Sequence, residues 1–374
     1  MTSPARFAEI VCAAAVRPGV MPVVRQAPAQ VAQEKWAAYR LDAATEQSLS
    51  PPERIKRMGR GQEMAILAVQ RALADATQLP AKGTGTAVSV GTAWAEEGDE
   101  IIFLENLVKF GEKGAKPAYF VNSVKNALAS QLALTFGFQG ENQTFAHDAL
   151  SFESALWQGA HLVRVGRVRH ALVCGVDALV EFQEIHGHLL GWYGSDSAPL
   201  APLAEARPGV GHGTLPGEGS AAFVLCAPGA GANPVARLAF LRARGPARRT
   251  APLHVESELA FLKRCLTDAD TRLADVGLLL LGANGDPALD AIYAEVACRL
   301  CALAPDLAVG VYRHLTGDFA TASALGFELA VRSVAHRRVV DEVRIVEGTA
   351  RPVERALLFH VTKAGYHSVM LVAA

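Results

Sequence analysis

The sequence lacks the features that mark membrane-spanning, secreted or nucleic-acid-binding proteins. Its 374 residues carry a formal net charge of −1, so no overall basic field attracts nucleic acid or an anionic membrane. No apolar run reaches the roughly 18–20 residues that span a bilayer, and residues 1–24 lack the basic region and apolar core of a signal peptide. We therefore predict a cytoplasmic protein without a membrane span or a nucleic-acid partner.

Cysteine is sparse and is not arranged as a metal site. The six cysteines lie mostly in apolar stretches, which is typical of reduced thiols in a cytoplasm. Cys298 and Cys301 have C-x-x-C spacing, but they lie in a helical pattern and no second pair accompanies them. No phosphate-binding or dinucleotide-binding glycine pattern stands at a strand–helix junction. We expect neither a metal nor a cofactor.

The patterning of apolar residues predicts an α/β protein. Apolar residues make up 51% of the chain and charged residues 20%, and short apolar runs alternate with longer helical patterns. Helices are predicted over Gln62–Ala76 and Phe152–Val165, and a third begins at Asp286-Pro287. Ten runs are predicted to be strands: Glu9–Ala13, Thr86–Gly91, Asn142–Ala146, His170–Val176, Ser220–Leu225, Val235–Leu241, Gly277–Leu281, Leu307–Gly310, Ala356–Val361 and His367–Val372.

The order of these elements occurs twice. Strand, helix, strand, helices and two closing strands precede residue 231, and a similar order follows Pro234. The joint between them, Ala227–Pro234, is rich in glycine and proline, as linkers are. We predict two halves, 1–231 and 232–374, which share one core.

Several motifs in order resemble those of the β-ketoacyl synthases of the thiolase superfamily. Arg57–Arg60 leads into a helix as the Arg-Met-x-Arg entry of that family does, and Pro216–Ala221 resembles its Gly-Glu-Gly-Ala signature. Between them, Gly140–Ser151 reads as a buried strand that turns sharply into a helix. The resemblance implies a thiolase-like α-β-α-β-α five-layer sandwich built from two pseudo-duplicated halves, the first of which carries the nucleophile turn.

The resemblance also shows that the family's catalytic positions have changed. Counted from Gly140, the cysteine that these enzymes acylate is replaced by Ala149, which has no nucleophilic atom. The two histidines that stabilise negative charge during malonyl decarboxylation and attack are replaced by Asn284 and Asp318. Near the C-terminus, the family's Gly-Phe-Gly-Gly turn with its gating Phe corresponds to Thr362–Gly365 in this sequence. Lys363 stands at the position of that Phe. No intact catalytic set remains.

Three residues could rescue an activity. Ser151 lies beside His147 and Asp148 and invites comparison with a Ser-His-Asp triad, but triads are assembled from distant segments. We favour Asp148 or Ser151 as the N-cap of the following helix. His314 could replace a lost base, although a hydrogen-bonded core or loop histidine is the simpler interpretation.

The resemblance implies a catalytically inactive subunit of the type called a chain length factor. Such a subunit completes a heterodimer with an active β-ketoacyl synthase, meets an acyl carrier protein through that complex, and bounds the tunnel in which the chain grows. Phe145, Phe152 and Trp157 are candidates to line that tunnel. Actinomycete chain length factors carry Gln at the cysteine position, so Ala149 favours an aryl-polyene-like pathway over another polyketide or fatty-acid-like one. A stand-alone acyl-thioester hydrolase or acyltransferase, and a non-enzymatic acyl-binding homodimer, remain alternatives.

Overall fold

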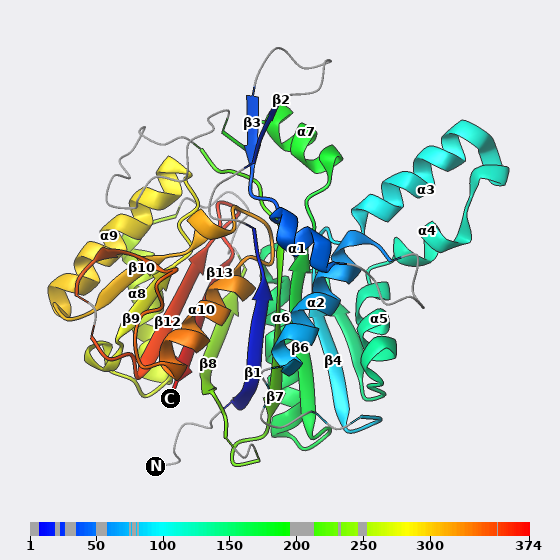
Figure 1. The fold of residues 1–374 in the computed structure, drawn as a ribbon. Coiled ribbons are helices and arrows are strands. Elements are labelled where there is room, and N and C mark those ends of the chain that lie inside the picture. The colour runs from blue at the N-terminus through cyan, green and yellow to red at the C-terminus, as the bar shows by residue number, and fades with distance from the viewer. Residues whose placement is uncertain are drawn as a thin grey trace.

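The fold is dominated by one large mixed sheet. A computed structural model describes residues 7–18, 23–26, 35–49, 58–74, 76, 80, 82–194, 213–230, 233–245, 253–349 and 351–374. Within this part of the chain, eleven strands follow the order β11-β10-β9-β12-β13-β8-β1-β7-β6-β4-β5 (Figure 1). Antiparallel pairing of Ala8–Ile10 in β1 with β8 joins the two sides of this sheet.

The strands on each side of the sheet follow the same order from the centre outward. Numbered by their position along the chain within that side, they are the first, last, fourth, second and third strands. On one side these are β1 (Ala8–Val16), β7 (Gly219–Cys226), β6 (His170–Asp177), β4 (Thr86–Gly91) and β5 (Asn142–Phe145). On the other they are β8 (Ala236–Arg244), β13 (His367–Ala373), β12 (Arg355–Val361), β9 (Leu278–Leu281) and β10 (Ala308–Val311), with β11 (Arg344–Glu347) added at the edge.

The alternation of side chains along the strands produces five layers. In β6, Ala171 and Val173 enter a core with the helices of the middle layer, whereas Leu172, Cys174 and Val176 enter a second core on the opposite face. A third core covers the outer face of the other side, where Leu357 and Phe359 of β12 point. This is the thiolase-like α-β-α-β-α sandwich that the sequence predicts.

Helices fill the layers on either side of the sheet. The middle layer holds α6 (Ser151–Arg164) and α10 (Ser323–Ala335). The first outer layer is formed by α2 (Arg60–Ala74) and α5 (Ala127–Phe136), and the second by α8 (Val255–Asp268) and α9 (Pro287–Leu303). Figure 1 shows α8 and α9 on the opposite side of the molecule from α5.

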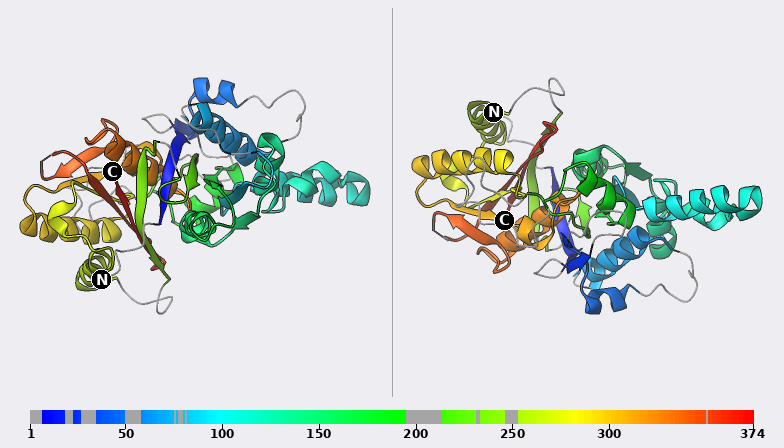
Figure 2. Two further views of the ribbon diagram at one scale, coloured as in Figure 1. Left: turned by 90° about the horizontal axis from the view of Figure 1, so that it is seen from below. Right: turned by 90° about the horizontal axis from the view of Figure 1, so that it is seen from above.

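A helical arm projects from the body. It consists of α3 (Glu97–Phe110) and α4 (Pro117–Asn122), and both views of Figure 2 show it extending past the layers. Large apolar side chains on the arm are exposed, with Val108 at 85% and Phe110 at 65%. The smaller elements are α1 (Ala43–Ser48), α7 (Glu181–Leu189) and the ribbon β2 (Val23–Gln26) and β3 (Lys35–Ala38). No helix in the described ranges is long and apolar enough to cross a membrane.

The predicted elements are confirmed with shifted ends. All ten predicted strands exist, α2 ends at Ala74, and α9 begins with Asp286 as its N-cap and Pro287 in its first turn. Gly166 takes the left-handed conformation (φ 73°) expected after α6. The strands β2, β3 and β11 were not predicted.

Candidate functional site

The turn between β5 and α6 has the sharp geometry that the sequence suggests. The prediction that the strand before it is buried was wrong, because β5 lies at the edge of the sheet and none of its residues is buried. Gly140 lies against the backbone of Thr86, where a Cβ atom would approach the Thr86 carbonyl oxygen to 2.5 Å. After β5, Asp148 adopts a positive φ of 48° and begins a short 3-10 turn to Leu150, from which α6 continues. Ala149 lies in this turn with 8% exposure. The position therefore lies at a helix N-terminus, as an activated thiol requires, but it carries a methyl group.

Ser151 is committed to the backbone of the same turn. Its hydroxyl accepts a hydrogen bond from the His147 N–H at 2.9 Å and donates to the Asp148 carbonyl at 2.7 Å. Its side chain is fully buried. The prediction that Asp148 or Ser151 caps the helix was wrong: Leu150 occupies the N-cap and makes no side-chain cap bond. The positive φ at Asp148 bends the chain so that Ser151 bonds backward to the turn.

The two rescue histidines face other partners. His147 Nδ1 lies 3.4 Å from Ser154 Oγ, and its ring contacts Tyr366 edge-on at 6.0 Å. His314 is buried in the 3-10 turn Arg313–Leu315. Burial, with the positive charge of Arg344, lowers the pKa of His314 to about 4. Among the described residues, neither imidazole hydrogen-bonds the Ser151 hydroxyl.

The two positions that the sequence analysis predicts to replace the family's histidines meet in space. Asn284 follows β9 and Asp318 precedes α10, yet Asn284 Nδ2 donates to Asp318 Oδ2 at 3.1 Å. The second oxygen, Oδ1, accepts from Arg313 Nη1 at 2.7 Å. Both carboxylate oxygens of Asp318 are therefore occupied, one by an amide and one by a guanidinium.

Arg313 extends this cluster into the core. Its side chain is 2% exposed, and its Nη2 donates to His360 Nε2 at 3.0 Å. Because arginine only donates, His360 accepts through Nε2 and its proton lies on Nδ1, which is 3.7 Å from Glu153 Oε1. Ser368 donates to the same Glu153 oxygen at 2.8 Å. We name Asn284, Asp318, Arg313, His360 and Glu153 the polar plug.

The turn that carries Asn284 is fixed by two carboxylates. Asp290 accepts from the backbone N–H groups of Asn284 and Gly285, each at 3.0 Å. Asp286 caps α9 and also accepts from Lys363 Nζ at 3.1 Å. The side chain of Lys363, the residue predicted to occupy the gate position, is 84% exposed. An ion pair of this exposure is worth roughly 0–1 kcal/mol.

The burial of Asp290 predicts a pH dependence of stability. Burial raises its pKa from 3.8 to about 6. Between about pH 4 and pH 6 the folded protein therefore holds a proton that the unfolded chain lacks, and this group makes stability fall as pH rises through that window. Urea unfolding measures the free energy of unfolding of Asp290→Asn and of the wild type. The variant's value minus the wild-type value should rise by up to about 3 kcal/mol between pH 4 and pH 6.5. The exposed Asp306→Asn is the control, and parallel pH curves for Asp290→Asn and the wild type would contradict the assignment.

The three aromatic candidates for the tunnel occupy different environments. Phe152 is fully buried in the middle layer, with its ring 5.6 Å from Phe223 and 5.8 Å from Phe327. Phe145 ends β5 and packs partly against the same core. Trp157 is 45% exposed on α6 and stacks on His161 at 5.2 Å. Trp157 is thus placed for contact with another molecule, and Phe152 for filling the interior.

Two buried carboxylates support the site: Asp177, which the sequence analysis missed, and Glu218, which it named only as part of the Gly-Glu-Gly-Ala signature. Asp177, at the end of β6, accepts five hydrogen bonds from Thr92, Ala93, Trp94 and Thr321, and so ties the turn after β4 to the entry of α10. Glu218 accepts from Arg60 and from two backbone N–H groups. Asp177 could have been identified from the sequence, because it is an acidic residue at the end of an otherwise mostly apolar strand. Arg57, the first residue of the Arg-Met-x-Arg motif, lies outside the described residues.

Metal-ligating clusters are absent from the described ranges: no group of three or more His, Cys, Asp or Glu side chains there is arranged to hold an ion. The polar plug pairs its carboxylates with arginine, amide and hydroxyl groups. It is a hydrogen-bonded cluster without a thiol, and two of its buried atoms, Glu153 Oε2 and Arg313 Nε, have no hydrogen-bond partner among the described residues.

Comparisons with known proteins agree with this architecture. A family model, that of the beta-ketoacyl synthase N-terminal domain, matches residues 25–228, more than half of the chain. No curated protein matches the chain in sequence.

Solved structures share the fold at low identity. One is a type II polyketide acyl carrier protein in complex with its ketosynthase (AntDE:AntF), with a TM-score of 0.80, 16% identity, and 99% of this chain and 100% of that chain covered. A second is the ishigamide ketosynthase/chain length factor, with a TM-score of 0.78, 18% identity and 99% of both chains covered. A third is the ketosynthase ApeO in complex with its chain length factor ApeC from Xenorhabdus doucetiae, with a TM-score of 0.76, 16% identity, and 99% of this chain and 98% of that chain covered.

Proposed function

Because this chain belongs to the β-ketoacyl synthase family, we propose that it is a non-catalytic member that pairs with an active ketosynthase and helps to shape the acyl-chain tunnel. The observation that carries this proposal is the polar plug. The positions of the two catalytic histidines hold Asn284 and Asp318, which bond each other at 3.1 Å. The position of the nucleophile holds Ala149.

The chemistry of condensation needs what this site lacks. Acyl transfer requires a nucleophilic atom at the N-terminus of α6. Decarboxylation of a malonyl unit requires hydrogen-bond donors that stabilise an enolate. An ionised Asp318 would repel the enolate, and its two oxygens are already bonded to Arg313 and Asn284. A ligand that competed for these donors would have to break a partly buried charged hydrogen bond, which is costly.

The surface around β5 supports pairing with a second subunit. In the sheet of the described residues, β5 is an edge strand whose only neighbour is β4. Dimers of this family join through the strand next to the nucleophile turn. Exposed apolar side chains also lie on and just after α6 and on the projecting arm: Trp157, Val165, Val108, Phe110 and Phe120. Apolar side chains left in solvent can serve as contacts with a partner.

The similar structures suggest the nature of the partner. Two of them are described as a ketosynthase together with a chain length factor, and a third as a ketosynthase with an acyl carrier protein. We infer the same kind of partners here: an active β-ketoacyl synthase in a heterodimer and, through it, an acyl carrier protein. An aryl-polyene-like pathway in the cytoplasm remains the favoured setting. Phe145 lies in the edge strand β5, and Trp157 is exposed on α6, which follows it.

The isolated chain is expected to be inactive. Incubated alone with malonyl-loaded and acyl-loaded carrier protein, it should release no carbon dioxide above the carrier-protein blank and form no acyl-enzyme detectable by intact-protein mass spectrometry. Ala149→Cys should become acylated at most slowly and should still not condense, because Asn284 and Asp318 are unchanged.

Ser151→Ala separates this proposal from a stand-alone hydrolase or acyltransferase. It should not change any of these readouts, because Ser151 Oγ is bonded to the backbone of its own turn. Turnover by the wild-type chain that Ser151→Ala abolishes would establish the enzyme instead. A homodimer that ignores co-expressed ketosynthases would favour the acyl-binding alternative.

A further inference from the structure

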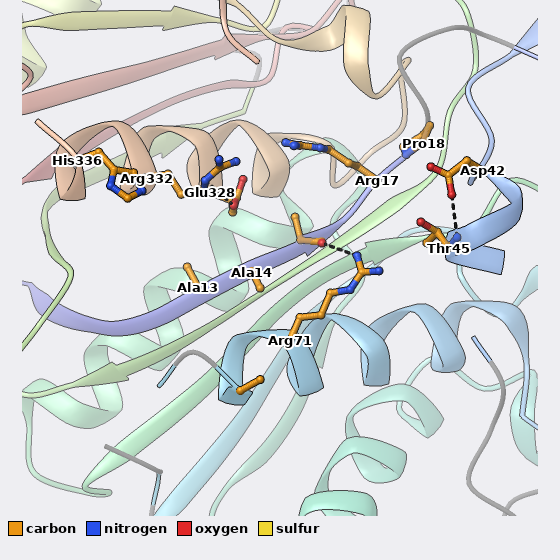
Figure 3. Close-up of a pocket in the computed structure, with 12 residues that line it drawn as sticks. Ala13, Ala14, Arg17, Pro18, Asp42, Thr45, Arg71, Glu328, Arg332 and His336 are labelled. Carbon is orange, nitrogen blue, oxygen red and sulfur yellow. Dashed lines mark hydrogen bonds and ion pairs between the residues drawn. The ribbon is translucent and has the colours of Figure 1, made fainter. Parts of the chain in front are cut away.

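A polar groove lies away from the polar plug, where the two sides of the sheet separate. Beyond Ile10, β1 no longer pairs with β8, and a groove of about 600 Å³ opens between α10 and α2. Figure 3 shows β1 running between these helices, with Arg71 reaching toward it from α2 and with Glu328, Arg332 and His336 along α10. The floor consists of Ala13, Ala14 and Ala15, whose small side chains leave the volume open.

Three guanidinium groups line this groove. Arg17 and Arg332 both bond Glu342, each at 2.8 Å, so one carboxylate is shared between two cations. Arg71 donates to the Ala15 carbonyl at 3.3 Å and forms no ion pair with any carboxylate that the structure describes. Asp42, at the end of the groove, is occupied by capping α1 through the Thr45 N–H. Guanidinium donors therefore exceed the described acceptors.

Glu328 adds an unsatisfied acceptor to the same groove. Its side chain is 6% exposed, and Arg332 Nε lies 3.7 Å from Oε1, beyond hydrogen-bond distance. The other oxygen, Oε2, is buried and has no hydrogen-bond partner among the described residues. A buried carboxyl oxygen without a partner is costly when the carboxyl is ionised, so Glu328 is suited to hold a proton. A group bound in the groove would share that proton through Oε1, the oxygen that is not fully buried.

We propose that this groove binds a phosphate group, with guanidinium donors from Arg71 and Arg17 on its oxygens and one proton shared with Glu328. Guanidinium matches phosphate geometry and charge. A phosphate group with one ionisable proton near neutral pH meets the need of Glu328, which a fully ionised group does not. The groove volume is within the range of small-molecule sites and accommodates either inorganic phosphate or a small phosphate monoester.

The sharing of a proton gives the site a pH signature. Burial raises the pKa of Glu328 to about 7, while Arg332 and Arg17 oppose this shift and Glu342 adds to it. The other charged or titratable groups around the groove are Arg71 on α2, Asp42 at α1 and His336 on α10. Above pH 8 both the phosphate and Glu328 lose their protons and repel each other, so binding should weaken.

Isothermal titration calorimetry with inorganic phosphate, at constant ionic strength, tests the site. The wild type should bind at pH 6.5 and lose about tenfold in affinity at pH 8.5. Glu328→Gln should bind without losing affinity between these pH values, because its amide donates at either pH. Arg71→Met should weaken binding at least tenfold, and Arg264→Gln, an exposed arginine of α8 outside the groove, should bind like the wild type.

Glycerol 3-phosphate distinguishes the two sources of the phosphate group. Tighter binding than inorganic phosphate assigns the site to a monoester, and equal or weaker binding assigns it to the free ion. No heat with either probe at millimolar concentration, or Arg71→Met binding as the wild type does, would overturn the proposal. Neither result tests whether the chain is catalytically inactive. The phosphate proposal can therefore be disproved without affecting the proposed function.

Discussion

Replacing Thr144 with proline is expected to abolish pairing with a ketosynthase while the subunit stays folded. The Val88 N–H donates to the Glu141 carbonyl and the Thr92 N–H to the Phe145 carbonyl. Because alternate residues of a parallel strand face the same neighbour, Thr144 directs its N–H to the open edge of β5. Proline there removes a donor that β4 does not use and places a ring against an incoming strand.

The size of this effect should be at least about 100-fold in the dissociation constant of the heterodimer, or roughly 3 kcal/mol. Size-exclusion chromatography and sedimentation of the co-expressed subunits measure it, and thermal melting checks the fold of the isolated variant. Thr144→Val is the matched control: it keeps the N–H and removes a hydroxyl that has no described partner. A heterodimer of normal affinity with Thr144→Pro would show that β5 is not the joining strand.

Replacing Arg313 with methionine is expected to destabilise the fold by about 3 kcal/mol. The guanidinium is 2% exposed and bonds both Asp318 and His360. Its loss leaves a carboxylate that is only 32% exposed without its cation and an imidazole nitrogen without its donor. The expected result in urea unfolding is a lower midpoint with an unchanged slope.

Two further variants distinguish the effect of losing the Arg313–Asp318 ion pair from the effect of losing any arginine. Arg338→Met removes an arginine that is 59% exposed and pairs with Asp341, and it should cost less than about 1 kcal/mol. In a double-mutant cycle with Asp318→Asn, the coupling with Arg313 should exceed about 1 kcal/mol. Equal effects of Arg313→Met and Arg338→Met would show that the polar plug contributes no stability.

The elements that bury a face were predictable, and the projecting ones were not. Apolar strands such as Leu278–Leu281 stand out because both faces are covered, so every side chain is apolar. The helix α3 exposes Val108 and Phe110 to solvent. Because the positions of its apolar residues do not mark a buried face, its place in the fold could not be predicted from them. The strand β11 is four residues long and half-buried, which leaves almost no periodic signal.

The contacts of the site could not be predicted from the sequence. The order of motifs predicts Asn284 and Asp318 at the histidine positions, but their hydrogen bond joins residues 34 apart. His360 and Glu153 come from β12 and α6 and were invisible as partners of Arg313. Ser151 was misread as a possible cap because a positive φ at Asp148 cannot be predicted from a non-glycine residue.

The central claim is tested most directly by reconstitution with a co-expressed active β-ketoacyl synthase and a malonyl-loaded acyl carrier protein. The prediction is a one-to-one heterodimer whose product formation requires both subunits. Loss of the partner's catalytic cysteine should abolish turnover, whereas Ser151→Ala in this chain should leave it unchanged. Turnover by this chain alone, or the same products at the same rate from the ketosynthase without it, would contradict the account.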